Sequence, residues 1–481
     1  MSSEKAGRVI VTYARGWQSL AVTRSLGRRG VEVITADEVA MTPASFSKYS
    51  TASFTYPDCS KNPDEFLDKL ESEIIRHKPD DLDTPYVLMP IHKETYLIAK
   101  HRERFEAHIR VPVPSIEQIE EVHNKGTLAA YAQDNGLCAP PTIFPASIEE
   151  LESRADEISL PAFVKLRESA AGVGIAKVDT REKLISYFKS LVDDYGLAPE
   201  DYPIVQQGVP GDDYCVTTLF DRGKLIACMT YRNIRQFPAD KGAGVVRETV
   251  KAEKMESVCE ALLGPKGWHG VAEIDFRWTG DLDEDPWLIE VNPRFWGGLT
   301  QAVESGWDYP WLLYRLAVDG EVDSPEDVSY DVKTEAPLVG LLATLQEISK
   351  SSTHSDNLKE AWKGAREEFN EGSKREGLRQ LFGGLKDFVD VKGRSETVQE
   401  LFKVHKNTVN DLFSSDDPRP MLGALYPLVV FLKHGKINME LLTSESGPPK
   451  AAEESDEDSG AKARAPLPAG SGGSCCWPSS C

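Results

Sequence analysis

The chain has 481 residues, of which 40% are hydrophobic and 27% are charged, and its net charge at pH 7 is −22. This length exceeds what one hydrophobic core usually organises, so we expect two to four structural units. Strong acidity repels a phosphate backbone and argues against general nucleic-acid binding. No run approaches the ~20 consecutive apolar residues of a membrane helix, and the first residues lack the pattern of a secretory leader. We therefore expect a cytoplasmic protein without a membrane partner.

Residues 1–114 predict a small α/β domain with parallel strands. Strands are expected over 8–11, 31–37 and 86–91, helices over 19–29 and 62–77, and a short edge strand over 110–114. The first β-α turn holds one glycine, Gly16, where a dinucleotide-binding turn needs G-x-G-x-x-G. Asp37 stands where a ribose-binding acid would lie, but without the glycines this domain is not expected to bind NAD or FAD.

The middle of the chain alternates helices and strands. We expect a helical segment over 115–136, followed by a strand, a small-residue loop and a second strand over 161–178. A helix over 181–195 and a strand over 204–209 should come next. A hairpin that turns at Asp221-Arg222-Gly223 and a helix over 253–263 complete this part. Five single cysteines are expected to be small buried apolar residues: Cys59, Cys138, Cys215, Cys228 and Cys259.

Beyond residue 321 the pattern becomes helical. Helices are expected over 344–350, 358–369, 378–389, 397–413 and 422–434. From residue 442 onward Pro, Gly, Ser, Glu and Asp dominate, which predicts disorder. Three more cysteines crowd the final CCWPSSC, which we interpret as an incidental tail.

Residues 270–298 carry most of the candidate chemistry, because two strands flank an acidic turn in a β-hairpin. Side chains alternate along a strand, so Glu273 and Asp275 share one face of the first strand, and Glu290 and Asn292 share one face of the second. The apolar face is expected to hold Ala272, Ile274, Phe276, Ile289 and Val291. The pairing should therefore gather the polar side chains together.

Like charges that face each other in a sheet are destabilising, and a cation would relieve them. All the donors are oxygens, which suits magnesium or manganese better than zinc. Arg294 points to the same side and could meet a transferred phosphoryl group. A solvated acidic face of an acidic protein is an equally valid interpretation of the hairpin alone.

The segment Glu290–Gly298, EVNPRFWGG, resembles the E-(I/V)-N-P-R motif of ATP-grasp enzymes. Residues 302–321 look like the sequel found in predicted carboxylate–amine ligases that are similar to the large subunit of carbamoyl-phosphate synthase. The resemblance covers roughly residues 8–321. It implies an α/β protein with an N-terminal pre-ATP-grasp Rossmann-like domain (1–114), a two-lobed α+β ATP-grasp domain (115–330), a C-terminal helical region (331–441) and a disordered tail (442–481).

The resemblance also implies roles for individual residues. The ATP-binding residues would be Lys125, Lys165, Gly172 and Gly174 of a flap over the phosphates, Gln207 and Val209 of the adenine-reading strand, and the ribose-binding Asp213. The metal ligands would be Asp275, Glu290 and Asn292, while Glu273 falls where relatives often have an apolar residue. Arg294 would be catalytic, and Arg247, with Arg235 behind it, would face the substrate. Taken alone, Lys125 reads as a solvated helix residue, and both Arg247 and Arg235 read equally well as surface residues.

The implied function is a ligase that uses ATP and Mg²⁺ (or Mn²⁺) to activate a carboxylate as an acyl phosphate. An amine or another nucleophile would then displace phosphate. Two alternatives stay open: an ATP-binding regulatory or scaffold protein without turnover, and a phosphotransferase on the same fold. The partners would be small-molecule carboxylate and amine substrates, and the C-terminal helices could form a homodimer interface.

Overall fold

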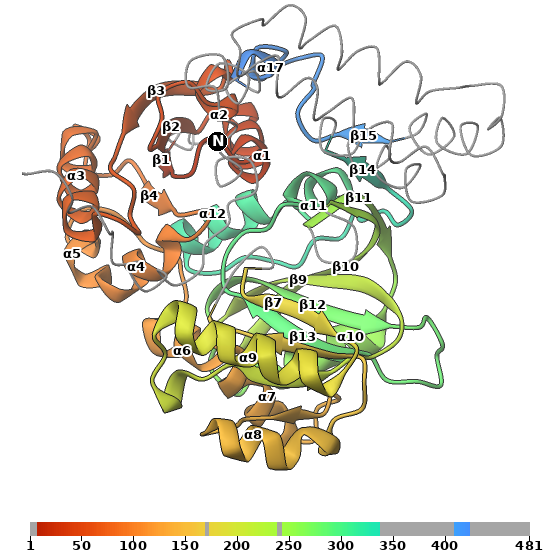
Figure 1. Ribbon diagram of the computed structural model, residues 1–481. Coiled ribbons are helices and arrows are strands. Elements are labelled where there is room, and N and C mark those ends of the chain that lie inside the picture. The colour runs from red at the N-terminus through yellow and green to blue at the C-terminus, as the bar shows by residue number, and fades with distance from the viewer. Residues whose placement is uncertain (1–6, 169–172, 238–242, 337–407, 424–481) are drawn as a thin grey trace, which may run out of the picture.

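The computed structural model describes residues 7–168, 173–237, 243–336 and 408–423 (Figure 1). Its N-terminal part is a four-stranded parallel sheet of order β3-β2-β1-β4 with helices around it. The elements are β1 (Arg8–Val11), α1 (Trp17–Arg28), β2 (Glu32–Asp37), α2 (Pro43–Phe46), β3 (Ser50–Thr55), α3 (Pro63–Arg76), β4 (Tyr86–Met89), α4 (Glu94–Lys100) and α5 (Arg102–Glu106). The predicted parallel α/β fold is confirmed here.

Two details of this sheet differ from the prediction. The sequence analysis missed β3, because its Ser- and Thr-rich residues alternate between partly and fully exposed and show no apolar period. The expected edge strand over 110–114 is reduced to a single bridge between Val87 and Arg110. Pro112 and Pro114 have no N–H to donate, so a ladder cannot continue there.

The next part is a small lobe around a second four-stranded sheet of order β5-β8-β6-β7. Its elements are α6 (Ile116–His123), α7 (Lys125–Asp134), β5 (Thr142–Ile143), α8 (Ile148–Arg154), β6 (Ala162–Lys165), β7 (Ile175–Val178), α9 (Arg181–Tyr195) and β8 (Ile204–Gln207), with 3₁₀ turns at Ala155–Glu157 and Pro199–Asp201. The helical segment predicted over 115–136 is two helices. Asn124 leaves the helical conformation and its side chain caps α7 by accepting from the N–H groups of Gly126 and Thr127, which ends α6.

A seven-stranded sheet of order β13-β12-β9-β10-β11-β14-β15 forms the large lobe. Its elements are β9 (Asp212–Asp221), β10 (Lys224–Phe237), β11 (Ala243–Val250), α10 (Glu253–Leu263), β12 (Gly270–Trp278), β13 (Trp287–Asn292), α11 (Leu299–Glu304), α12 (Tyr309–Asp319), β14 (Lys333–Glu335) and β15 (Val409–Asn410), and α17 (Pro420–Gly423) follows. Apolar residues of β9 and β12, such as Val216 and Ile274, pack with Met255 and Cys259 of α10 on one face. Helix α12 lies between this sheet and the N-terminal domain (Figure 1).

The structure tests the C-terminal prediction at two places. Leu422 and Gly423 belong to α17, which agrees with the start of the helix predicted over 422–434, whereas the helix predicted over 397–413 is wrong at its end. A helix was expected over 397–413, but Val409–Asn410 is a strand that pairs in parallel with β14. Pairing at the edge of a large sheet overrides a local helical period. The helices predicted over 344–350, 358–369 and 378–389, most of the one over 422–434, and the tail from residue 442 lie outside the described residues. Within the described part of the chain, no helix is both long and apolar enough to cross a membrane.

The β12–β13 hairpin forms as predicted, with one irregularity. The register pairs Glu273 with Asn292 and Asp275 with Glu290, and then slips so that Phe276 pairs with Leu288. Ile289 is the extra residue of this bulge, and Leu288 takes the core position expected for Ile289. The slip preserves the alignment of the polar pairs, so the predicted polar face is intact.

We expect Gly211, just before β9, to be essential for the packing of the large lobe. An alanine Cβ there would lie 2.3 Å from the carbonyl carbon of Trp278, and the residue has a φ of +108°. Gly136 is the matched control, because it has a φ of +65° but a Cβ there would meet nothing within 4 Å. Overpacking costs about 1–3 kcal/mol beyond backbone strain. Gly211→Ala should therefore lower the thermal unfolding midpoint more than Gly136→Ala does, and equal midpoints would contradict this packing.

Candidate active site

The polar face of the β12–β13 hairpin is the centre of the candidate site. The Asn292 side-chain amide donates to Asp275 Oδ2 and to Glu290 Oε1, both at 3.3 Å. Glu273 stands on the same face, opposite Asn292. The structure therefore brings together the three predicted metal ligands, Asp275, Glu290 and Asn292, and adds Glu273 beside them.

Two lysines from the small lobe reach this face. Lys125, at the start of α7, is only 4% exposed, and its Nζ lies 3.2 Å from Glu290 Oε2. Lys165, at the end of β6, is also buried and donates to Gln206 Oε1 at 2.6 Å. Burial lowers the pKa of Lys165 to about 8, with the charge of Lys125 adding to this effect and that of Glu290 opposing it. Burial alone would raise the pKa of Glu290, but the charges of Lys125 and Lys165 hold it at about 2.

The other two carboxylates have no such partner. Burial and the neighbouring Glu273 and Glu290 raise the pKa of Asp275 well above its usual range. Burial likewise raises the pKa of Glu273, whose carboxylate accepts a hydrogen bond from the Tyr231 hydroxyl. Among the described residues, Lys125 forms an ion pair with Glu290, and no lysine forms an ion pair with Glu273 or Asp275. One face therefore holds one stabilised carboxylate and two destabilised ones.

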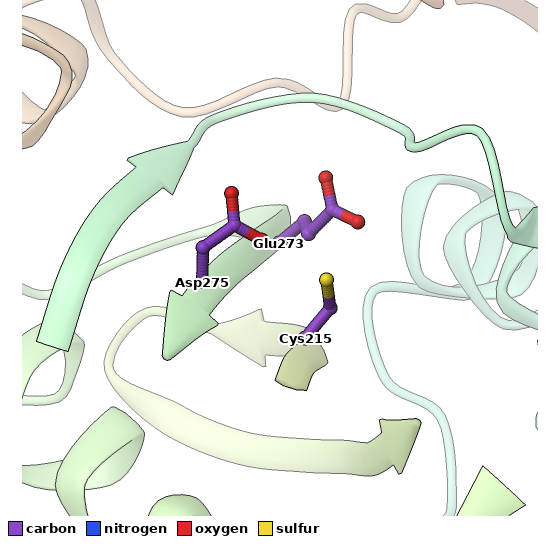
Figure 2. Close-up of side chains that lie close together, drawn as sticks. All are labelled: Cys215, Glu273 and Asp275. Atoms are coloured by element: carbon purple, nitrogen blue, oxygen red, sulfur yellow. The ribbon is translucent and has the colours of Figure 1, made fainter. Parts of the chain in front are cut away.

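Cys215 also belongs to this cluster, although the sequence analysis treated it as an ordinary buried cysteine. Figure 2 shows its sulfur pointing toward the carboxylates of Glu273 and Asp275, and one ligand atom from each of the three residues lies within 4.8 Å of the others. Burial and these two carboxylates raise the pKa of the thiol well above its usual value. The signal was available, because Cys215 stands two residues after Asp213 and so shares its face of β9.

Arg294 closes one side of the cluster. Its Nη2 donates to Asn292 Oδ1 at 3.2 Å and its Nη1 donates to the carbonyl of Phe295 at 2.8 Å. Its charge lowers the pKa of Glu273 and also that of His92, which follows β4 in the N-terminal domain. Burial is the main cause of the very low pKa of His92, whose ring stacks on Tyr13 at 4.6 Å. The N-terminal domain therefore extends to the neighbourhood of Arg294, which no sequence pattern indicated.

Arg247 lies on the same face of the sheet, and its charge lowers the pKa of Glu273. It is buried on β11, and its Nη1 lies 2.9 Å from Asp411 Oδ2, in the residues that follow β15. Sequence analysis placed Arg247 on the substrate side and did not select Asp411, which is 164 residues away. The structure thus gives this arginine an internal partner.

The predicted adenine-reading strand is β8 and the residues after it. The N–H groups of Gln207 and Gly208 donate to the carbonyls of Pro141 and Pro161, both at 2.9 Å, so these two donors are used within the protein. Val209 is half-buried just beyond β8. A backbone contact to adenine therefore stays a prediction for Val209 and is disfavoured for the N–H of Gln207.

The remaining predicted nucleotide residues surround the same lobe junction. The carboxylate of Asp213 accepts from Arg277 Nη1 at 2.7 Å and from Gln236 Nε2 at 2.6 Å, so a ribose would compete with two protein donors. Gly174 has a φ of +63°, and a Cβ there would lie 2.2 Å from Leu166 Cδ1, which explains the glycine by packing. Gly172 lies outside the described residues.

Asp37 does not offer a free ribose-binding carboxylate either. It is buried, and it accepts from the backbone N–H of Arg15 at 2.8 Å and from the Arg15 side chain. Burial raises its pKa, and the Arg15 charge opposes that rise. Arg15 thus occupies the position that a dinucleotide ribose would need.

Comparison with known proteins agrees with this architecture. Residues 201–336 match the family model described as "ATP-grasp in the biosynthetic pathway with Ter operon". No curated protein matches the chain. The structure is similar to a biotin carboxylase–β,γ-ATP complex from Campylobacter jejuni, with a TM-score of 0.55 and 17% identity over 68% of this chain and 74% of that one.

Two ligases are also similar in structure. L-amino acid ligase from Bacillus licheniformis has a TM-score of 0.50 and 17% identity over 66% of this chain and 75% of that one. Phosphoribosylamine–glycine ligase from Thermotoga maritima has a TM-score of 0.50 and 16% identity over 68% and 78% of the two chains. The fold is therefore the ATP-grasp fold, and the predicted resemblance to the ATP-grasp superfamily is confirmed. Identities this low establish the fold and leave the activity to be tested.

The unequal carboxylates lead us to expect opposite effects of two similar substitutions in metal-free protein. Asp275→Asn removes a charge that is repelled by its neighbours, so it should stabilise the fold by about 1 kcal/mol. Glu290→Gln removes the negative charge that lies 3.2 Å from the buried Lys125 and should destabilise the fold by about 2 kcal/mol. Thermal midpoints measured in a metal chelator check both signs. Asp323→Asn, in the exposed loop after α12, is the neutral control, and a destabilised Asp275→Asn protein would refute the assignment.

Proposed function

We propose that this protein is an ATP- and magnesium-dependent ligase that activates a substrate carboxylate as an acyl phosphate and joins it to an amine or another nucleophile. The observation that carries the proposal is the convergence of Asp275, Glu290 and Asn292 with Lys125 and Lys165 where the two lobes meet. Similarity to a biotin carboxylase that is complexed with β,γ-ATP and to two ligases supports it.

The donor set fits a magnesium ion. Asp275, Glu290 and Asn292 present oxygens only, which Mg²⁺ and Mn²⁺ prefer. Asp275 is repelled by its neighbours and has no cationic partner among the described residues, so a divalent cation would relieve an existing strain. When bound, the cation would neutralise charge on phosphate oxygens. The similar carboxylase domain from Hydrogenobacter thermophilus was solved with MgADP, which supports the same pairing of nucleotide and metal.

The protein side chains would mainly bind and orient the reactants. The buried amines of Lys125 and Lys165 would hold phosphate oxygens, because a desolvated ammonium attracts an anion strongly. Arg294, fixed by Asn292 and the Phe295 carbonyl, would face the phosphoryl group in transfer.

The proposed reaction has two steps. A carboxylate oxygen attacks the γ-phosphorus of ATP, the bond from that phosphorus to the β–γ bridging oxygen breaks, and ADP leaves. The amine nitrogen then attacks the acyl carbon, the carbon–oxygen bond to phosphate breaks, and the nitrogen loses a proton. Positioning and charge stabilisation account for both steps, so no side-chain nucleophile is needed.

The test measures ADP release with Mg²⁺ and ATP over pools of amino acids and small carboxylic acids. Arg294→Ala should lower turnover at least about a hundredfold, because it removes a cation from the developing charge. Arg76→Ala, on the outer face of α3 with a side chain 71% exposed, is the matched control and should change nothing. Tight ATP binding without acid-dependent turnover would reject the ligase in favour of a binding protein. A stable phosphorylated product would indicate a phosphotransferase.

A further inference from the structure

Residues 408–423, here called the C-terminal strap, lie along the large sheet and the N-terminal domain (Figure 1). We propose that the C-terminal strap, through Asp411 and Arg247, positions the loop over residues 293–298 that carries Arg294. Arg247 is then a positioning residue in place of the substrate contact predicted from sequence. The catalytic part of this inference rests on the proposed ligase function, and its structural part does not.

One end of the C-terminal strap is built into the large sheet. Val409 and Asn410 pair with Thr334 and Glu335 of β14, and the N–H of Asp411 donates to the Glu335 carbonyl at 2.9 Å. The side chain of Asp411 is fully buried and meets the equally buried Arg247 at 2.9 Å. A buried ion pair is costly to break on one side, because it leaves a charge without compensation. Asp411 therefore fixes the position of Arg247.

The other end is held by the N-terminal domain. Asp417, also fully buried, accepts from Arg24 Nε at 3.0 Å, from Ser47 Oγ at 2.7 Å and from the Lys48 N–H at 2.9 Å. Arg24 additionally donates to the Leu412 carbonyl at 2.8 Å. Both ends thus depend on a buried aspartate and an arginine, and the strap joins two parts that are distant in sequence.

Arg247 contacts the loop that follows Arg294. A Cβ on Gly298 would lie 3.0 Å from Arg247 Cδ and 3.2 Å from its Nε, so the arginine stem supports the backbone at this glycine. A Cβ on Gly298 would also lie 3.3 Å from Tyr231 Cζ, and the Tyr231 hydroxyl donates to Glu273. A continuous set of contacts therefore runs from Asp411 through Arg247 to Gly298, four residues after Arg294.

The test compares two aspartates of the same strap in the full-length protein. Asp411→Asn removes the buried partner of Arg247, whereas Asp416→Asn removes an exposed partner of Arg28 and is the control. Amide hydrogen exchange should rise over residues 293–300 in Asp411→Asn and stay at the wild-type rate in Asp416→Asn. Unchanged exchange over 293–300, or an equal rise over the whole chain, would overturn the proposal, because either result means a purely structural ion pair.

Turnover and a second variant complete the test. In Asp411→Asn, kcat should fall about tenfold with little change in KM for ATP, since Lys125 and Lys165 are untouched; a rise in KM alone would overturn the positioning role. Should Asp411→Asn fail to fold, Gly298→Ala reaches the same contact from the loop side and should raise exchange over 408–412. If wild type shows no turnover, the ligase proposal fails, while the exchange measurements still decide the role of the strap.

Discussion

Three carboxylates, those of Glu273, Asp275 and Glu290, are held on one face of a single hairpin. Sheet geometry forces this, because the register sets Asp275 against Glu290 and the apolar side of the same strands must pack on α10. Neighbouring like charges cannot all stay ionised at no cost. The small lobe relieves one of them with Lys125 and leaves the others to accept hydrogen bonds or a cation. Lys125 thereby links the start of α7 to the β12–β13 hairpin.

The same polar face continues across the large sheet. Alternate residues of each strand point to it: Cys215 on β9, Tyr231 on β10 and Arg247 on β11. Helix α12 and the N-terminal domain cover this face, so the residues far from the hairpin, such as Arg247, are buried as well. Arg247 consequently needs a buried counter-charge, and the chain supplies Asp411 from a segment 164 residues away. One buried polar face thus explains why elements from both ends of the sequence meet there.

Features that depend on the local period of side chains could be predicted from the sequence, whereas features that depend on tertiary contacts could not. Alternation placed Asp275 and Asn292 on one face, because an antiparallel hairpin aligns side chains with period two. The bulge at Ile289 broke that period, and nothing in the apolar pattern marked it. Asp411 was hidden for a different reason: its importance lies in a partner far along the chain, and its own surroundings resemble a helix. The position of Cys215 could be predicted only in part. Its spacing from Asp213 indicates the face of β9 on which it lies, but its neighbours on β12 follow only from the order of the strands in the sheet.

The Lys125–Glu290 pair has a further meaning within the proposed function. Without nucleotide, the buried ammonium of Lys125 and the partly exposed carboxylate of Glu290 compensate each other. When a phosphate approaches Lys125 and a divalent cation approaches Glu290, each residue gains a new partner that carries the opposite charge. Lys125 and Glu290 therefore have an opposite charge beside them both before and after the ligands bind. Neither charge has to be desolvated without a partner when the reactants arrive. Such a site is pre-organised by its own ion pair, and for that reason the two buried lysines and Glu290 have to be considered together.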